Sequence, residues 1–214
     1  MRGTFVTFEG IEGSGKSTQI VLLANHLKTT GMQVVLTREP GGTPIGDQVR
    51  RILLNPEHTA LDPTAELLLY AASRAQHLHE VILPALDRGA VVLCDRFSDA
   101  TLAYQGYGRG LDIEMIRALD RIVTMPEARP SLTLLFDIDA ASGIARAHSR
   151  NASQGLLAEA RFENEELAFH ERVRQGYLVL SRQEPDRIRI VDASPSPGEV
   201  HALVRAIVDK RLRS

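Results

Sequence analysis

The sequence predicts an α/β domain with a parallel sheet of five strands layered by helices. Five short runs rich in aliphatic and β-branched residues recur along the chain, and their almost continuous apolar character is typical of strands covered on both faces. Segments with helical spacing separate these runs, and such alternation favours right-handed crossovers and a parallel sheet. Ligands of such sheets bind at the carboxyl ends of the strands, where we therefore expect the functional motifs. The five runs are residues 5–8, 34–37, 91–95, 132–137 and 188–191.

The longest helical pattern covers residues 64–87. One side of it carries apolar residues, namely Leu67, Leu68, Ala71, Ala75, Leu78 and Ile82. Residues 149–160 read SRNASQGLLAEA and form the least regular stretch of the chain. Their Ser, Asn and Gly content between two helical patterns predicts a loop, and a long loop in a compact domain is usually functional or disordered. We interpret this stretch as part of a small lid at about residues 146–161.

The chain has 214 residues, a length that fits one domain and buries a sufficient core without disulfides or a structural metal. No internal repeat and no linker divides it, so residues 1–214 are expected to form a single domain. No apolar stretch approaches the roughly 20 residues that span a bilayer, and the N-terminus lacks a signal-peptide pattern. The expected location is therefore the cytoplasm.

Charge and side-chain chemistry argue against several kinds of partner. With 25 basic and 27 acidic residues, the net charge of −2 disfavours a general attraction to nucleic acid or to a membrane surface, and we expect neither partner. The single cysteine, Cys94, lies in the apolar run VVLC, where a buried and inert thiol is expected. His77 and His79 are two residues apart on a predicted helix and therefore diverge, which disfavours a metal site there.

Residues 10–17 read GIEGSGKS and fit the phosphate-loop pattern G-x-x-x-x-G-K-[ST] between a predicted strand and a predicted helix. The glycines let backbone amides converge on phosphate groups, Lys16 supplies charge to the β and γ oxygens, and Ser17 places a hydroxyl on Mg²⁺. We therefore expect a nucleoside triphosphate as co-substrate, Mg²⁺ as cofactor and Ser17 as the metal ligand. The residues expected to bind the triphosphate are Gly10, Ile11, Glu12, Gly13, Ser14, Gly15, Lys16, Ser17 and Thr18.

The phosphate loop alone does not identify the acceptor of the phosphoryl group. The chain has no N-K-x-D tetrapeptide, which disfavours a GTPase switch. The predicted strand at residues 91–95 ends in Asp95 followed by Arg96, whereas a mechanical ATPase usually carries an acidic pair there. This favours a phosphate acceptor site. It leaves open a kinase of some other small acceptor, or a regulatory nucleotide-binding ATPase.

Five sequence blocks extend over nearly the whole chain. They are FEGIEGSGKST at residues 8–18, TREPGGT at 37–43, ELLLYAASRAQH at 66–77, DRFSDATLAYQG at 95–106 and RFENEELAFHERVRQGYL at 161–178. Together these blocks resemble the thymidylate kinase family, for which TREPGGT followed by the DR…AYQG block is highly specific. The resemblance implies a P-loop nucleoside monophosphate kinase fold and a homodimer. It also implies a reaction in which ATP and dTMP give ADP and dTDP, with Mg²⁺ and without a covalent intermediate.

The resemblance implies a site for the phosphate of the acceptor nucleotide. Arg96 and Arg50 would hold this phosphate, with Arg38 close by at the TREPGG turn. Arg50 and Arg51 are adjacent, so on a helix only one of them can point into the site, and we assign Arg50. Asp95 would orient the metal ion and its waters.

The resemblance also implies which residues recognise the base. Tyr70 and Arg74 are spaced i, i+4 and share a helix face, so Tyr70 would stack on thymine while Arg74 hydrogen-bonds a carbonyl of the base. Thr101 and Gln105 look like the residues that read the imide edge, although Ala100 stands where family members often place serine. A regulatory ATPase would not need such a pocket for a second nucleotide.

Two further residues resemble those that recognise the sugar. Tyr104 is similar to the family tyrosine that crowds the 2′ position and so favours deoxyribose. Glu12, inside the phosphate loop, is similar to the acidic residue that accepts a hydrogen bond from the 3′-hydroxyl.

Phosphoryl transfer needs positioning and charge neutralisation more than a nucleophile. The expected catalytic residues are Lys16, Arg96, Arg150 and Asp95. One branch of the family places an arginine inside the phosphate loop, but Gly13 stands at that position here, so the extra charge must come from elsewhere. The arrangement resembles the bacterial branch, in which lid arginines close over ATP. The candidates that flank or enter the predicted lid are Arg146, Arg150 and Arg161, with Arg150 as first choice.

Overall fold

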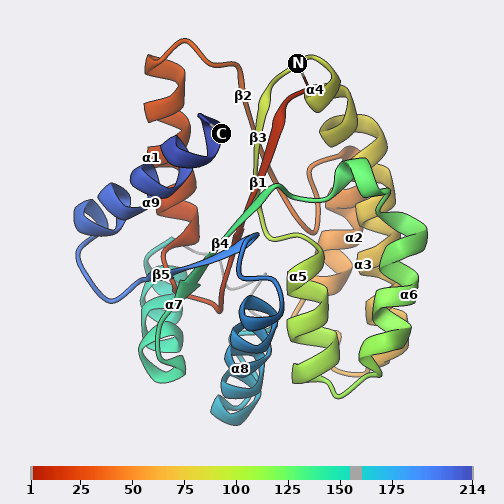
Figure 1. Cartoon of the computed structure of the whole chain (residues 1–214). Helices are drawn as coiled ribbons and strands as arrows, with labels where there is room; N and C mark the ends of the chain where they lie inside the picture. The colour runs from red at the N-terminus through yellow and green to blue at the C-terminus, as the bar shows by residue number, and fades with distance from the viewer. Residues whose placement is uncertain (1, 155–160, 214) are drawn as a thin grey trace.

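The structure is a computed structural model that describes residues 2–154 and 161–213. It contains a five-stranded parallel sheet with the strand order β2–β3–β1–β4–β5 (Figure 1), which confirms the predicted fold class. All five predicted strands are present, each within one residue of its expected ends. They are β1 (Thr4–Glu9), β2 (Val34–Arg38), β3 (Val91–Asp95), β4 (Leu132–Asp137) and β5 (Ile188–Asp192).

Helices of three kinds connect the strands. Among the described residues, no helix is both long and apolar enough to cross a membrane. The α-helices are α1 (Lys16–Thr29), α2 (Pro44–Leu54), α3 (Pro63–His77), α4 (Leu83–Asp87), α5 (Ser98–Thr101), α6 (Ile113–Val123), α7 (Ala140–Gln154), α8 (Leu167–Gln183) and α9 (Pro197–Leu212). The π-helical segments are η1 (Leu78–Ile82) and η2 (Leu102–Gly108), and the 3₁₀ turn is η3 (Pro126–Ala128).

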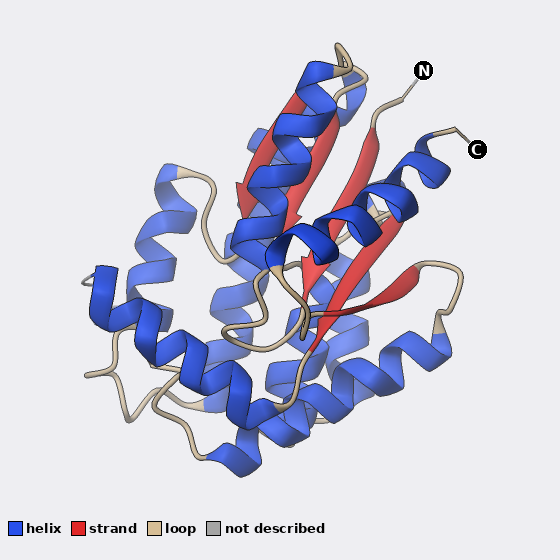
Figure 2. Ribbon diagram, turned by 90° about the vertical axis from the view of Figure 1, so that its left-hand side faces the viewer, coloured by secondary structure: helices blue, strands red, loops and turns tan. Residues whose placement is uncertain are grey.

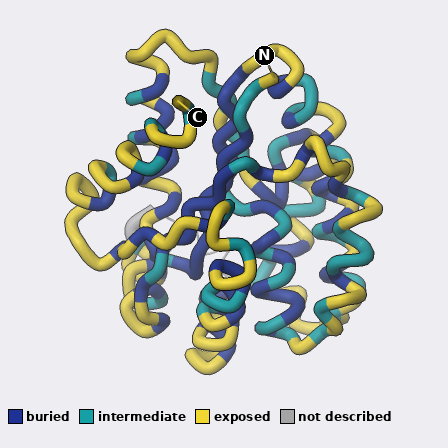
Figure 3. The backbone as a smooth tube through the Cα atoms, in the orientation of Figure 1, coloured by how far each residue is buried: buried dark blue, intermediate teal, exposed yellow. Residues whose placement is uncertain are grey.

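The three middle strands form the centre of the core. Side chains of β1, β3 and β4 are buried along almost their whole length, whereas β2 and β5 at the two edges are more exposed (Figure 3). Val6 of β1 pairs with Leu93 of β3 on one side and with Leu132 of β4 on the other. Each middle strand thus has a strand on both sides and helices on both faces, which explains the nearly continuous apolar runs in the sequence.

Helices cover both faces of the sheet and leave the carboxyl ends of the strands open for a site. On one side α1 and α9 pack against each other, and Figure 2 looks onto this side. On the other side α4 lies against β3, and α8 packs on β4 and β5 (Figure 1). Because all strands are parallel, the ends of β1, β3 and β4 meet at one edge of the sheet, with β1 between its two neighbours.

The helix predicted at residues 64–87 is present but consists of three consecutive parts, α3, η1 and α4. The wider turn η1 follows His77, which is fully buried and lies against Glu39. His79 is exposed, so the two histidines diverge as the sequence predicts. Cys94 is buried in β3, as expected of an inert thiol.

The prediction of an irregular stretch from residue 149 onward is wrong for its first part. Residues 149–154 continue α7, and residues 155–160 lie outside the described part of the chain. Asn151 explains the difference, because its buried side chain donates to Glu163 Oε1 at 3.4 Å and accepts from Arg150. The contact with Glu163 stabilises a helix that local composition disfavours.

Candidate active site

The phosphate loop joins the end of β1 to the start of α1, at the carboxyl edge of the sheet. Gly13 has a φ of 68°, a backbone conformation that side chains rarely adopt. A Cβ added to Gly13 would lie 1.9 Å from the carbonyl oxygen of Gly143 in α7. Glycine is therefore required here for the backbone angle and for the close approach of the loop to α7. An arginine would not fit at this position.

Lys16 begins α1, and its ammonium group folds back onto the phosphate loop. Nζ donates to the carbonyl oxygens of Gly10 and Ile11 at 2.9 and 2.7 Å and to Ser14 Oγ at 3.1 Å. The side chain is buried, and burial, reinforced by the charge of Arg96, lowers the pKa of Lys16 to about 8. A phosphate chain at the N-terminus of α1 would meet both this ammonium group and the positive end of the helix dipole.

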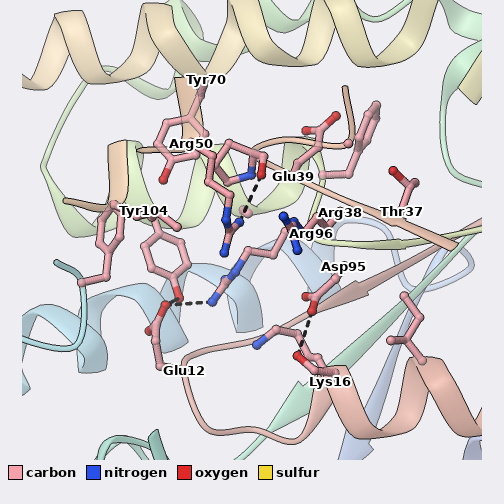
Figure 4. Close-up of a pocket in the computed structure, with 18 of the residues that line it drawn as sticks. Glu12, Lys16, Thr37, Arg38, Glu39, Arg50, Tyr70, Asp95, Arg96 and Tyr104 are labelled. Carbon is pink, nitrogen blue, oxygen red and sulfur yellow. Dashed lines mark hydrogen bonds and ion pairs between the residues drawn. The ribbon is translucent and has the colours of Figure 1, made fainter. Parts of the chain in front are cut away.

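Ser17 and Asp95 meet where α1 begins and β3 ends. Ser17 Oγ donates a hydrogen bond to Asp95 Oδ2 at 3.0 Å. Asp95 is the last residue of β3 and points toward Lys16 (Figure 4). The structure therefore brings together the two oxygen-bearing side chains that the sequence assigns to the metal ion.

Arg96 follows β3 with a φ of 69°, and it is the only non-glycine residue of the described chain with a positive φ. Its guanidinium donates to the Gly10 carbonyl oxygen at 3.0 Å and to Glu12 Oε1 at 2.8 Å, and it lies 4.7 Å from the centre of the Tyr104 ring. Such backbone strain persists only where the surroundings fix it, and it is frequent at functional sites. The strained backbone directs the guanidinium across the end of β1.

Glu12 is the carboxylate at which the phosphate loop and the neighbouring side chains meet. Besides Arg96, its Oε1 accepts a hydrogen bond from the Tyr104 hydroxyl at 2.7 Å (Figure 4). Burial alone would raise the pKa of Glu12, but the nearby Arg96, His170 and Lys16 outweigh it and hold this pKa below its usual value. Glu12 is therefore an ionised hydrogen-bond acceptor at neutral pH.

Two cavities meet at the phosphate loop. The larger, of about 660 Å³, extends over the ends of β1 and β3, and the smaller, of about 470 Å³, lies between the loop, α7 and the start of α9. Gly13, Lys16, Ser17 and Arg150 line both cavities. A group passed between molecules in the two cavities would therefore cross this junction. All residues that the resemblance assigns to the acceptor line the larger one, namely Glu12, Arg38, Arg50, Tyr70, Arg74, Arg96, Thr101, Tyr104 and Gln105.

Two arginines border the larger cavity near the TREPGG turn. Arg50 Nη1 donates to the Pro40 carbonyl oxygen at 3.1 Å, and its neighbour Arg51 is exposed and does not line the cavity. Arg38 lies 3.6 Å from Asp47, and about half of its side chain is exposed. Both cavity-lining guanidinium groups are thus placed where an incoming phosphate could reach them (Figure 4).

The residues assigned to the base hold one another through hydrogen bonds. Arg74 is buried, with Nε donating to Glu39 Oε2 at 2.8 Å and Nη2 donating to Thr101 Oγ1 at 2.7 Å. Gln105 Nε2 donates to Glu66 Oε1 at 2.7 Å. The cavity wall opposite the phosphate loop is therefore built in advance from paired side chains, which limits the cost of ordering it around a ligand.

The three arginines that the sequence analysis assigns to a lid lie in different places. Arg146 Nη1 donates to the Ala193 carbonyl oxygen at 3.0 Å, on the wall of the smaller cavity. Arg161 is buried, pairs with Glu66 and the Leu53 carbonyl oxygen, and lines neither cavity. Of the three, only Arg150 lines both cavities.

The contact between the phosphate loop and α7 yields a prediction for Gly143. A Cβ there would lie 2.7 Å from the Glu12 carbonyl oxygen and 2.9 Å from Ile11 Cδ1, so Gly143→Ala must push α7 away from the loop. We expect a loss of about 1–3 kcal/mol in the free energy of unfolding, and a kcat at least roughly tenfold lower, because α7 carries Arg146 and Arg150.

The matched control for Gly143 is Gly198, which also lies in a helix. A Cβ added to Gly198 would meet no atom of the described chain within 4 Å, so Gly198→Ala should be neutral or slightly stabilising. Thermal unfolding and steady-state kinetics of the two variants check both expectations. Equal behaviour of the two would contradict the close loop–helix contact as a functional feature.

Three buried residues near the site did not follow from the sequence. Burial, with the charge of Asp99, raises the pKa of Glu9 to about 8, and Glu9 accepts hydrogen bonds from the Tyr177 hydroxyl and the Phe97 backbone, each at 2.7 Å. His170 lies beside Glu12. A carboxylate at a strand end hints at Glu9, but nothing in the local sequence around His170 or Tyr177 indicates that α8 brings them to the phosphate loop.

Known proteins resemble the chain over almost its entire length. Residues 8–204, which include all residues that line the two cavities, match the family model described as thymidylate kinase. The chain is 59% identical to the thymidylate kinase of Syntrophotalea carbinolica over 92% of its own length and 90% of that protein. It is 55% identical to that of Trichlorobacter lovleyi, over 97% and 98% of the two chains. The crystal structure of thymidylate kinase from Ehrlichia chaffeensis has a TM-score of 0.77 and 34% identity, over 98% and 99% of the chains.

Proposed function

The chain belongs to the thymidylate kinase family, and from that premise we propose that it transfers the γ-phosphoryl group of ATP to dTMP to give ADP and dTDP. The observation that carries the proposal is the pair of cavities that meet at Gly13, Lys16, Ser17 and Arg150. One cavity would hold ATP and the other dTMP, so that the γ-phosphoryl group and its acceptor oxygen meet at the junction. Holding two reactants in this way lowers the entropic part of the barrier.

The phosphate loop would hold the phosphates of ATP. Lys16 would exchange its loop carbonyl partners for β and γ oxygens, whose charge restores the preference for the ammonium form. Ser17 and Asp95 offer two oxygen ligands of the kind that Mg²⁺ prefers, and Mg²⁺ normally takes its other ligands from water and phosphate. Bound there, Mg²⁺ would neutralise charge that develops on the transferred group.

The acceptor side would be set by the larger cavity. Arg50 and Arg96 would fix the phosphate of dTMP so that one of its oxygens faces the γ-phosphorus, and Arg38 would add charge from the TREPGG turn. Tyr70 would stack on thymine, while Arg74 reaches the base edge.

The sugar and the rest of the base would be recognised by cavity-lining side chains near Arg96. Thr101 and Gln105 would contact the imide edge of thymine, and Tyr104 would crowd the 2′ position of the sugar. Glu12 would accept a hydrogen bond from the 3′-hydroxyl as Arg96 turns toward the acceptor phosphate.

Transition-state charge would be neutralised by groups already at the junction. The proposed catalytic residues are Lys16, Asp95, Arg96 and Arg150. A lid that closes over ATP would exclude water and so prevent hydrolysis. No side chain has to act as a nucleophile, because the phosphate of dTMP itself attacks.

A panel of acceptors tests the proposal. ADP release from ATP and Mg²⁺ should be at least about 10²-fold faster in kcat/KM with dTMP than with dCMP, dGMP or dAMP, because a site built to hydrogen-bond one base leaves polar groups unpaired with another. Equal turnover with all four acceptors would indicate a different small acceptor. ADP release that does not depend on any acceptor would indicate the regulatory ATPase.

The assembly and location of the protein form the remaining part of the proposal. A homodimer is supported by exposed apolar side chains on the neighbouring helices α3 and α6, where Leu68 is 53% and Ile122 is 80% exposed. Large apolar side chains exposed in this way favour contact with a second protein surface. We propose the cytoplasm as the location, where ATP is available.

A further inference from the structure

Glu12 has a close neighbour that the phosphate loop does not provide. His170 of α8 is fully buried, and its Nδ1 lies 3.3 Å from Glu12 Oε2. The other carboxylate oxygen, Oε1, faces Arg96 and Tyr104 in the larger cavity (Figure 4). The imidazole therefore approaches the carboxylate from the side opposite the proposed substrate.

In the described part of the chain, neither Glu12 Oε2 nor the His170 ring has another polar partner. Glu12 Oε2 and both ring nitrogens of His170 are buried and form no well-aligned hydrogen bond with the described residues. An ionised carboxylate can only accept, and a neutral imidazole carries a single N–H. The tautomer with the proton on Nδ1 is the one that offers a donor to Oε2. Because an unpaired buried polar group is unfavourable, His170 Nδ1 and Glu12 Oε2 stabilise each other.

The position of His170 is fixed by close packing between α8 and η2. A Cβ added to Gly176 would lie 2.7 Å from the Tyr107 ring, and one added to Gly108 would lie 2.7 Å from the ring of Phe169. The two elements therefore pack closely against each other through glycine surfaces that have no room for a side chain. The ring of Phe169 also stands at 89° to that of His170, with 5.5 Å between the ring centres.

We infer that His170 is a positioning residue that holds Glu12 Oε2 from behind and thereby keeps Oε1 directed at the 3′-hydroxyl of the acceptor sugar. This inference rests on the proposed function. Without the imidazole, Glu12 is held only at Oε1, by Arg96 and the Tyr104 hydroxyl, and Arg96 would leave Oε1 when it turns toward the acceptor phosphate. The orientation of the carboxylate is then less restricted, and a less restricted carboxylate contributes less to binding a hydroxyl than one held at both oxygens before the ligand arrives.

The test compares dTMP with its 3′-deoxy analogue, which lacks the hydroxyl in question. The measured quantity is the preference for dTMP, defined as the ratio of the two kcat/KM values. His170→Phe keeps the size of the ring but removes the donor, and it should lower the preference by about tenfold, the amount expected for one hydrogen bond to a charged group. Effects on folding or on the phosphate contacts cancel in this ratio, because both substrates share them.

Two amide variants separate the nitrogens of the ring. In His170→Asn the amide nitrogen can take the place of Nδ1, so this variant should retain the preference for dTMP to within about threefold. In His170→Gln the amide nitrogen extends toward the position of Nε2, so this variant should lose the preference as His170→Phe does. Glutamine also serves as the test if the phenylalanine variant does not fold. In a Glu12→Gln background, His170→Phe should no longer change the preference. The control His79→Phe alters an exposed histidine and should leave the ratio unchanged.

The outcomes distinguish the inference from the function on which it rests. If both rates fall equally in His170→Phe and the ratio stays constant, His170 is merely structural and the inference is overturned. An unchanged ratio with unchanged rates overturns it as well. Failure of the unsubstituted protein to phosphorylate dTMP would instead refute the proposed function, and with it the sugar hydroxyl as the target of Glu12.

Discussion

Replacing Lys16 with methionine should lower kcat for phosphoryl transfer by on the order of 10³ while the protein remains folded. The ammonium group sits at the junction of the two cavities, where negative charge on the transferred group would develop. Methionine retains the length of the buried stem and removes only the charge and the donors. Steady-state kinetics with both substrates varied measures the loss, and a folded variant with normal kcat would contradict the role of the phosphate loop.

The fold should survive this change because the partners of Lys16 have other donors. The Gly10 carbonyl oxygen also accepts from Arg96 Nη1, and the Ile11 carbonyl oxygen also accepts from Ser14 Oγ. Burial disfavours the charged form of Lys16, so its removal relieves a cost of folding at neutral pH, where the lysine is charged in the folded and the unfolded chain. The midpoint of thermal unfolding should therefore be unchanged or slightly higher.

The same lysine sets a pH dependence for the unsubstituted protein. Because burial lowers the pKa of Lys16 to about 8, the free enzyme carries the ammonium below this pH and loses it above. The value of kcat/KM for ATP reports on the free enzyme, so it should fall as the pH rises through about 8. The kcat value should hold to higher pH, because bound phosphates favour the protonated form. A constant kcat/KM up to pH 10 would contradict this.

The sequence was sufficient to predict the fold, because the local strand and helix patterns agree with the overall α/β arrangement. The apolar runs of β3 and β4 are long enough to predict both strands with their correct ends, and GIEGSGKS occupies the only kind of junction, strand to helix, where a phosphate loop works. The same agreement fails at residues 149–154. There, polar residues predict a loop, but the buried Asn151 side chain donates to the buried Glu163, a contact that the local sequence cannot reveal.

Site residues were predictable where one motif carries several of them, as with Lys16 and Ser17. The contacts between side chains of different motifs could not be predicted. Glu66 and Arg161, for example, are remote in the chain, and nothing in either block indicates that they form a buried ion pair. That pairing holds the Arg161 guanidinium at Glu66, outside the linings of both cavities, so we expect Arg150 or Arg146 rather than Arg161 to reach the γ-phosphoryl group.

Replacing Arg150 with alanine should lower kcat by on the order of 10² to 10⁴ and change dTMP affinity little. Gly13 excludes an arginine from the phosphate loop, because a Cβ there would overlap the Gly143 carbonyl. Positive charge at the transferred group must therefore come from another element. Arg150 lines both cavities, and 39% of its side chain is exposed. Its Nη2 donates hydrogen bonds to Asn151 Oδ1 at 2.9 Å and to Glu163 Oε1 at 3.3 Å.

These contacts make Arg150 suited to act only when ATP is bound. An ion pair that is more than a third exposed is weak, so the guanidinium can leave Glu163 for phosphate oxygens, which bind it more strongly. Rates with ATP and dTMP varied independently check the prediction, and Arg205→Ala, an exposed arginine of α9 that lines neither cavity, should leave them unchanged. A near-normal kcat in Arg150→Ala would transfer the role to Arg146, since that guanidinium lies on the smaller cavity whereas Arg161 is held by Glu66.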